Sequence, residues 1–191
     1  MPSRSGVDYR RLFDAFILVT ALHFLTFYIT MYWLLPLQAA YTPNLASYAS
    51  LLFLPHGVRI LSAWLLGWRA IPLFIPSSIV THWINFGASG FTLLGMMGAM
   101  SGVVCAVVTF WALAKVGMDF RLSAERRANW GDMLIAGAIA SLINTFGMGY
   151  AFGHNTATLA GYFIGDLSGL IACMLVLMLV FRILRARGRY R

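Results

Sequence analysis

Three long stretches of this sequence contain no charged side chain, and they constrain the fold more than any other feature. They cover residues 15–58, 70–114 and 133–165. Because one helical crossing of a bilayer needs about 20 apolar residues, each stretch is long enough for at least one crossing. Of the 191 residues, 60% are hydrophobic and 10% are charged, whereas about a quarter of a typical soluble domain is charged. The composition predicts a membrane protein and excludes a soluble enzyme, a disordered chain and a nucleic-acid-binding module.

Turn residues and charges divide the apolar stretches into six predicted helical spans. We expect an all-α, polytopic transmembrane bundle that forms a single domain over residues 1–191, because no hydrophilic stretch is long enough for a second domain. The predicted spans cover residues 12–35, 48–67, 70–85, 91–114, 130–151 and 158–181.

The basic residues predict the orientation of these spans. With the N-terminus inside, 13 of the 14 lysine and arginine residues lie in inner segments: the N-terminal arm, the turn at Arg69, the loop 115–127 and the C-terminal tail. The outer loops contain none, so the positive-inside rule places both termini in the cytoplasm. We interpret the arginine-rich tail, residues 182–191, as a contact for anionic lipid and not for nucleic acid.

Five ionisable side chains lie at membrane depth in the predicted spans, where charge is costly and by default marks a function. They are His23, His56, Arg59, His82 and Asp166. Arg59 and Asp166 are expected at similar depths and are the only opposite charges at that level. His56 lies one helical turn before Arg59. The three residues form either a ligand-binding site or a structural ion pair that fixes the packing of two helices. We interpret His23, in the first span, as a hydrogen-bonded core histidine.

Further polar residues are expected in the same outer half of the bundle. His82 and Asn85 lie near the outer end of the third span, and Asn144 lies in the outer half of the fifth. Buried polar side chains in a membrane face the bundle interior or a cavity. We therefore expect a polar pocket that opens outward. No spacing typical of metal or cofactor ligands, and no catalytic constellation, occurs in the sequence, so we expect neither a cofactor nor an enzyme.

Glycines at four-residue intervals predict close helix packing. Such spacing places the glycines on one helix face, so that another backbone can approach closely. The alternative is that the same glycine faces form the contact between copies in a homo-oligomer. The glycines concerned are Gly98 and Gly102 in the fourth span and Gly161, Gly165 and Gly169 in the sixth.

Two motifs resemble the bacterial membrane-associated sensor (MASE-type) domain. The first is residues 54–72, LPHGVRILSAWLLGWRAIP, with a Pro-x-Gly helix, a Gly-x-Arg turn and a proline that opens the next helix. The second is residues 165–169, GDLSG. The resemblance covers roughly residues 51–185 and implies perception of a ligand or of membrane state by a protein of a bacterial inner membrane. Such domains usually precede a diguanylate cyclase or histidine kinase module. No such module follows residue 191, so we expect a protein partner for output.

The leading hypothesis is thus a sensor-like or small-molecule-binding bundle with an outward-facing pocket. One alternative is the substrate-binding subunit of a vitamin-type uptake transporter, a class that also has about six helices and no motor of its own. The other is a structural or assembly subunit of a larger membrane complex.

Overall fold

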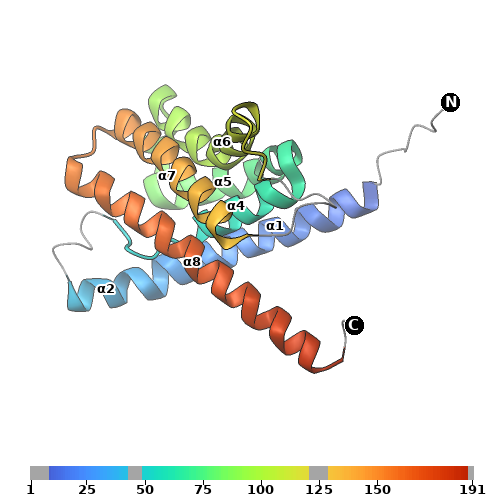
Figure 1. Cartoon of the computed structure of the whole chain (residues 1–191). Coiled ribbons are helices and arrows are strands. Elements are labelled where there is room, and N and C mark those ends of the chain that lie inside the picture. The colour runs from blue at the N-terminus through green and yellow to red at the C-terminus, as the bar shows by residue number, and fades with distance from the viewer. Residues whose placement is uncertain (1–8, 43–48, 121–128, 189–191) are drawn as a thin grey trace.

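The computed structural model describes residues 9–42, 49–120 and 129–188, which are mainly helical and include no strand (Figure 1). The predicted all-α class is confirmed, and five helical stretches among these residues are long and apolar enough to cross a membrane. The α-helices are α1 (Tyr9–Ile29), α2 (Leu35–Tyr41), α4 (Leu54–Leu66), α5 (Ala70–Phe86), α6 (Leu93–Lys115), α7 (Trp130–Phe152) and α8 (Thr156–Ala186). A π-helical turn, Thr30–Leu34, joins α1 to α2.

The second predicted span differs most from the structure. We expected a helix over residues 48–67, but α4 begins at Leu54 and has 13 residues. At 1.5 Å per residue it is about 20 Å long, less than the ~30 Å hydrocarbon core of a bilayer. Pro55 occupies the first turn of α4, where its missing N–H costs no hydrogen bond. Residues 49–53 are not helical, and Tyr48 lies outside the described residues.

The polar backbone groups of residues 49–53 bond to neighbouring helices. Gln38 of α2 donates from Nε2 to the Ala49 carbonyl (2.9 Å) and accepts at Oε1 from the Leu51 N–H (2.8 Å). The Phe53 N–H donates to the Gly165 carbonyl of α8 (2.8 Å). Unpaired backbone groups are expensive in lipid. These bonds therefore allow a non-helical segment to lie inside the bundle.

The three glycines of α8 lie against this non-helical segment. A Cβ atom on Gly161 would lie 2.8 Å from the Ala49 Cβ, and Cβ atoms on Gly165 and Gly169 would overlap the backbone of residues 50 and 53. The Ser168 hydroxyl, on the same stretch of α8, donates to the Leu51 carbonyl at 2.5 Å. The glycine spacing of α8 thus allows the close approach that was predicted, but the backbone that approaches is the non-helical segment 49–53 and not another helix.

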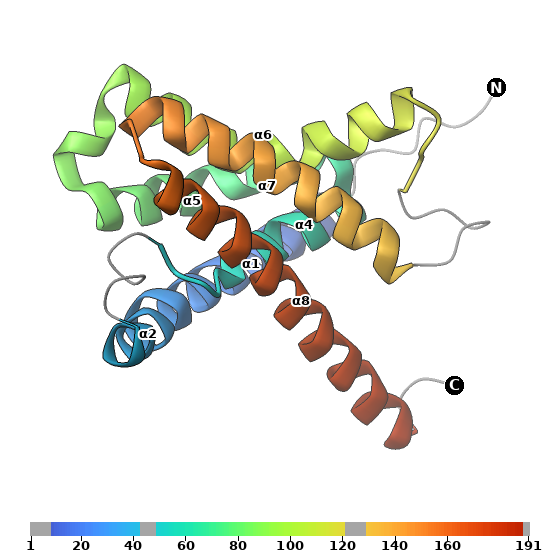
Figure 2. The ribbon, with the colours of Figure 1, turned by 60° about the vertical axis from the view of Figure 1, so that its left-hand side comes forward.

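Helix α4 packs against α1, α5, α6, α7 and α8, with a core of apolar side chains such as Ile60, Phe74 and Leu170. Helices α5, α6 and α7 run alternately back and forth beside it (Figure 2). The C-terminal half of α8 diverges from the other helices in both views (Figures 1 and 2). Its apolar side chains, among them Val176 and Phe181, are largely exposed, as expected of a helix surface that faces lipid.

Candidate functional site

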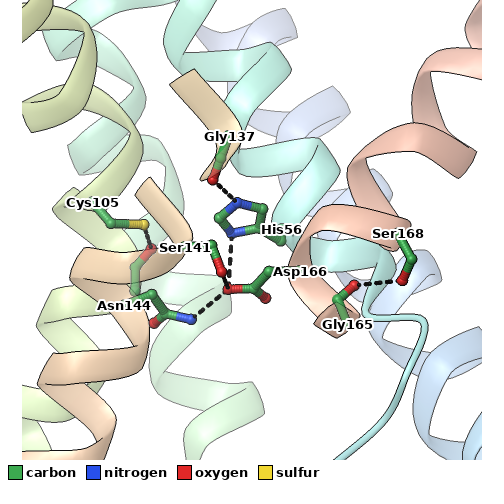
Figure 3. Close-up of polar contacts among 9 residues, drawn as sticks. His56, Cys105, Gly137, Ser141, Asn144, Gly165, Asp166 and Ser168 are labelled. Carbon is green, nitrogen blue, oxygen red and sulfur yellow. Dashed lines mark hydrogen bonds and ion pairs between the residues drawn. The ribbon is translucent and has the colours of Figure 1, made fainter. Parts of the chain in front are cut away.

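Asp166 is the centre of a buried polar cluster that joins α4, α7 and α8 (Figure 3). Its side chain is 2% exposed. The Oδ2 atom accepts hydrogen bonds from the Ser141 hydroxyl (3.0 Å) and from the Asn144 Nδ2 (3.1 Å). His56 Nδ1 lies 3.4 Å from the same oxygen. One carboxylate oxygen thus holds side chains of two other helices.

His56 links this cluster to the backbone of α7. Its ring is fully buried, and its Nε2 lies 3.2 Å from the Gly137 carbonyl. Figure 3 shows the ring between Gly137 and Asp166. The sequence predicts that Asp166 and Arg59 lie at one depth and meet, but among the described residues Asp166 lies beside His56, which forms an ion pair with it only when the imidazole is protonated. The His56 ring occupies the space between α7 and α8, whereas the Arg59 side chain extends towards α6.

Arg59 makes no hydrogen bond or ion pair within the described part of the chain, and its Nε atom is buried. Its guanidinium carbon lies 5.9 Å from the centre of the Phe53 ring, a cation–π contact. Gly102 of α6 provides the space for the side chain, since a Cβ there would lie 3.1 Å from both Arg59 Nη1 and Asn144 Oδ1. Arg59 is thus a half-buried cation whose buried Nε has no acceptor among the described residues.

Arg59 and Asp166 line one cavity of about 300 Å³, which is partly open. The cavity lies where α5 and α7 end and where α6 and α8 begin. Of the predicted site residues, His82, Asn85 and Asn144 also line it, as do Gly98 and Gly102. His56 does not, because it lies behind Asp166. The structure thus places most of the predicted polar residues around a single cavity.

His82 lies at the end of this cavity among aromatic rings. Its Nε2 is 2.9 Å from the Gly90 carbonyl. Its ring lies 4.9 Å from that of Phe86 and 6.2 Å from that of Phe152, measured between centroids. These contacts hold the end of α5 against the end of α7. On α6, a Cβ on Gly98 would lie 2.9 Å from the Ala151 Cβ, so Gly98 allows the close packing of α6 on α7.

Two residues of the cavity that were not predicted as site residues have an unpartnered polar atom. His23 of α1 is fully buried and bonds through Nδ1 to the Ser77 hydroxyl (2.9 Å), as expected of a core histidine, but its Nε2 has no partner. Ser78 of α5 is 7% exposed, and its hydroxyl also has no partner. Both line the cavity. A lone serine or histidine in an apolar run carries no sequence signal that separates a core role from a site role.

The GDLSG motif has a physical explanation in this geometry. Gly165 and Gly169 admit residues 49–53, Ser168 bonds to that segment, and Asp166 faces the opposite way into the polar cluster. The motif therefore joins the non-helical segment to the cavity wall. No protein-family model, curated protein or solved structure matches this chain.

Proposed function

We propose that this chain is an integral membrane, sensor-like bundle that binds a small molecule in an outward-facing cavity and acts through a protein partner. The observation that carries the proposal is the cavity of about 300 Å³ into which unpartnered polar side chains of α1, α4 and α5 project. Buried polar groups are normally hydrogen-bonded, and an unsatisfied one costs about 1–3 kcal/mol. A ligand that bonds to these groups would remove that cost.

The arrangement of charge supports the orientation in this proposal. Seven of the eight described basic residues lie at the start of α1, in the turn between α4 and α5, or at the ends of α6 and α8. Those helix ends share one side of the bundle, and the cavity lies towards the other (Figure 2). By the positive-inside rule, the basic side faces the cytoplasm of a bacterium, so that the cavity faces outward from the inner membrane.

The sensor-like role is favoured over the two alternatives by the packing of α8. An assembly subunit would use the glycine face of α8 to contact a partner, but residues 49–53 cover that face. A vitamin-uptake subunit also has an outward pocket, and the chemical identity of the ligand separates it from a sensor. The resemblance of residues 54–72 and 165–169 to MASE-type domains supports sensing, because each motif contributes one charged residue, Arg59 and Asp166, to the lining of the cavity.

A matched pair of substitutions on α6 tests the proposal. Ala99 lines the cavity, whereas Ala112 is on the exposed surface of the same helix. We expect a compound from a bacterial metabolite library to raise the unfolding temperature of the purified wild-type chain in detergent. The Ala99→Leu variant should lose this shift because leucine fills the cavity, and Ala112→Leu should keep it. The proposal is wrong if no compound stabilises the wild type more than it stabilises Ala99→Leu.

We also propose that the basic side of the bundle holds an anionic lipid. A groove of about 430 Å³ runs between the diverging end of α8 and the helices α4 and α7. Its wall is apolar, with Trp64, Trp130 and Leu177 among the lining residues, and Arg182 and Arg185 lie at its rim. An acyl chain against the apolar wall and a phosphate on the arginines would match this arrangement.

The lipid site predicts a difference between arginines of the same helix end. Replacing Arg182 and Arg185 with glutamine should reduce the phosphatidylglycerol retained by the purified chain, as measured by native mass spectrometry. Each arginine near an anionic surface contributes about 1 kcal/mol, so the double variant should bind about thirtyfold more weakly. Arg187 is not among the groove residues, and Arg187→Gln serves as the control. If Arg187→Gln loses half the binding free energy that the double variant loses, the loss reflects general surface attraction and not a site.

A further inference from the structure

The unpartnered polar atoms of the cavity belong to three different helices. They are His23 Nε2 of α1, Arg59 Nε of α4 and Ser78 Oγ of α5. His23 is fully buried and Ser78 is 7% exposed. Neither side chain lies on the outer surface of the bundle, where bulk water would supply its hydrogen bonds. Arg59 supplies only donors, and the Ser78 hydroxyl is able to donate. The Ser77 hydroxyl donates to the Phe74 carbonyl (3.1 Å), so it accepts from His23 Nδ1 and leaves His23 Nε2 as an acceptor. Arg59 and Ser78 are therefore the two groups of the three that recognise an acceptor.

The charges of the cavity distinguish an anionic ligand from a cationic one. Asp166 already receives two hydrogen bonds and the His56 contact on Oδ2. Arg59 has no carboxylate partner and no hydrogen bond among the described residues. The Arg59 side chain is half-buried, but its Nε atom is buried without an acceptor, and an unsatisfied buried donor is costly. The component that Arg59 lacks among the described residues is therefore an acceptor, and an anionic acceptor also matches its charge.

On the basis of the proposed function, we infer that the ligand carries a carboxylate and that Arg59 and Ser78 hold it. A guanidinium group pairs with a carboxylate through two parallel hydrogen bonds. Arg59 is the one arginine or lysine that lines the cavity within the described residues, which matches a single negative charge better than the higher charge of a phosphate. The rest of the ligand is apolar, because the remaining wall includes Phe27, Met31 and Phe86.

Three probes of the same shape but different charge test this inference. They are 3-phenylpropionate, 3-phenylpropionamide and 3-phenylpropylamine, each small enough for a cavity of this volume. Their binding to the purified full-length chain in detergent is measured by the shift in unfolding temperature and by titration. We expect the carboxylate to bind at least about tenfold more tightly than the amide, and the amine not to bind, because hydrogen bonds to charged groups are the stronger ones.

Substitutions then connect this preference to the residues. Arg59→Gln should remove the preference for the carboxylate, whereas Arg69→Gln, the same change in the exposed turn between α4 and α5, should keep it. Ser78→Ala should weaken carboxylate binding by about fivefold, the effect of one hydrogen bond. Arg59→Lys is the substitute test if Arg59→Gln does not fold. It keeps the charge but loses the two-bond geometry, so it should reduce the preference for the carboxylate.

The remaining outcomes overturn the inference. If the amide or the amine binds as tightly as the carboxylate, the cavity does not select an anion, although it still binds small molecules as proposed. If none of the three probes binds the wild type, the inference is also wrong. The comparison of Ala99→Leu with Ala112→Leu then decides the proposed function independently, because that comparison does not depend on the charge of the compound.

Discussion

Replacing Asp166 with alanine is expected to destabilise the chain by about 2–6 kcal/mol, because two buried donors lose their acceptor and each such loss costs about 1–3 kcal/mol. The substitution leaves the Ser141 hydroxyl, the Asn144 amide and the His56 ring without their common acceptor. Among the described lining residues it also leaves Arg59 as the one arginine, lysine or carboxylate of the cavity. The free energy of unfolding in mixed detergent micelles, followed by the helical circular dichroism signal, measures this loss.

The control for Asp166 is Asp14, which lies on the exposed surface of α1. Asp14→Ala should change the free energy of unfolding by less than about 0.5 kcal/mol, as is usual for surface positions. A double-mutant cycle between Asp166→Ala and Ser141→Ala should show a coupling energy of at least about 0.5 kcal/mol, and a cycle with Arg59→Gln should show a smaller one. A larger coupling energy with Arg59→Gln than with Ser141→Ala would instead support a direct Arg59–Asp166 ion pair.

The second large effect is expected at Gly169. Alanine at this position would place its Cβ against the backbone of Phe53 and Leu54, and no side-chain rotation relieves such an overlap. Either residues 49–53 or α8 must move, and we expect a loss of about 1–3 kcal/mol in the free energy of unfolding. Because Phe53 lies against Arg59 and both line the cavity, probe binding should weaken together with stability.

Gly131, in the first turn of α7, provides the matched control for Gly169. A Cβ there would meet its nearest neighbour, Asn129 Oδ1, at 3.6 Å, an ordinary van der Waals distance. Gly131→Ala should be neutral or stabilising by up to about 1 kcal/mol, since alanine reduces the freedom of the unfolded chain. If Gly169→Ala is tolerated as well as Gly131→Ala, the close approach of α8 to the non-helical segment is not present in the protein.

The helical class could be predicted from the sequence because long uncharged stretches have few alternatives in a membrane. The depths of Arg59, Asp166, His82 and Asn144 followed from helix length and orientation, and all four line one cavity. Depth does not determine the direction of a side chain around its helix. The sequence therefore does not indicate that Asp166 faces His56. It also does not indicate that Arg59 has no hydrogen-bond or ion-pair partner among the described residues.

The break before α4 could not be predicted from composition, since residues 49–53 are mostly apolar and resemble helical spans. Their conformation depends on groups distant in sequence, such as Gln38 and the Gly165 carbonyl, which replace the missing helical hydrogen bonds. Pro55 marks where α4 begins, but a proline is also common within membrane helices. The glycine spacing of α8 indicated a close approach without indicating what approaches.

The central claim is that the cavity beside Arg59 holds a small molecule. An experimental density map of the full-length chain in a lipid nanodisc tests it most directly. We predict a compact density, separate from the acyl chains, in contact with Arg59 and absent from the Ala99→Leu variant. A cavity filled by an acyl chain continuous with the bilayer, or one closed by a direct contact between Arg59 and Asp166, would contradict the account.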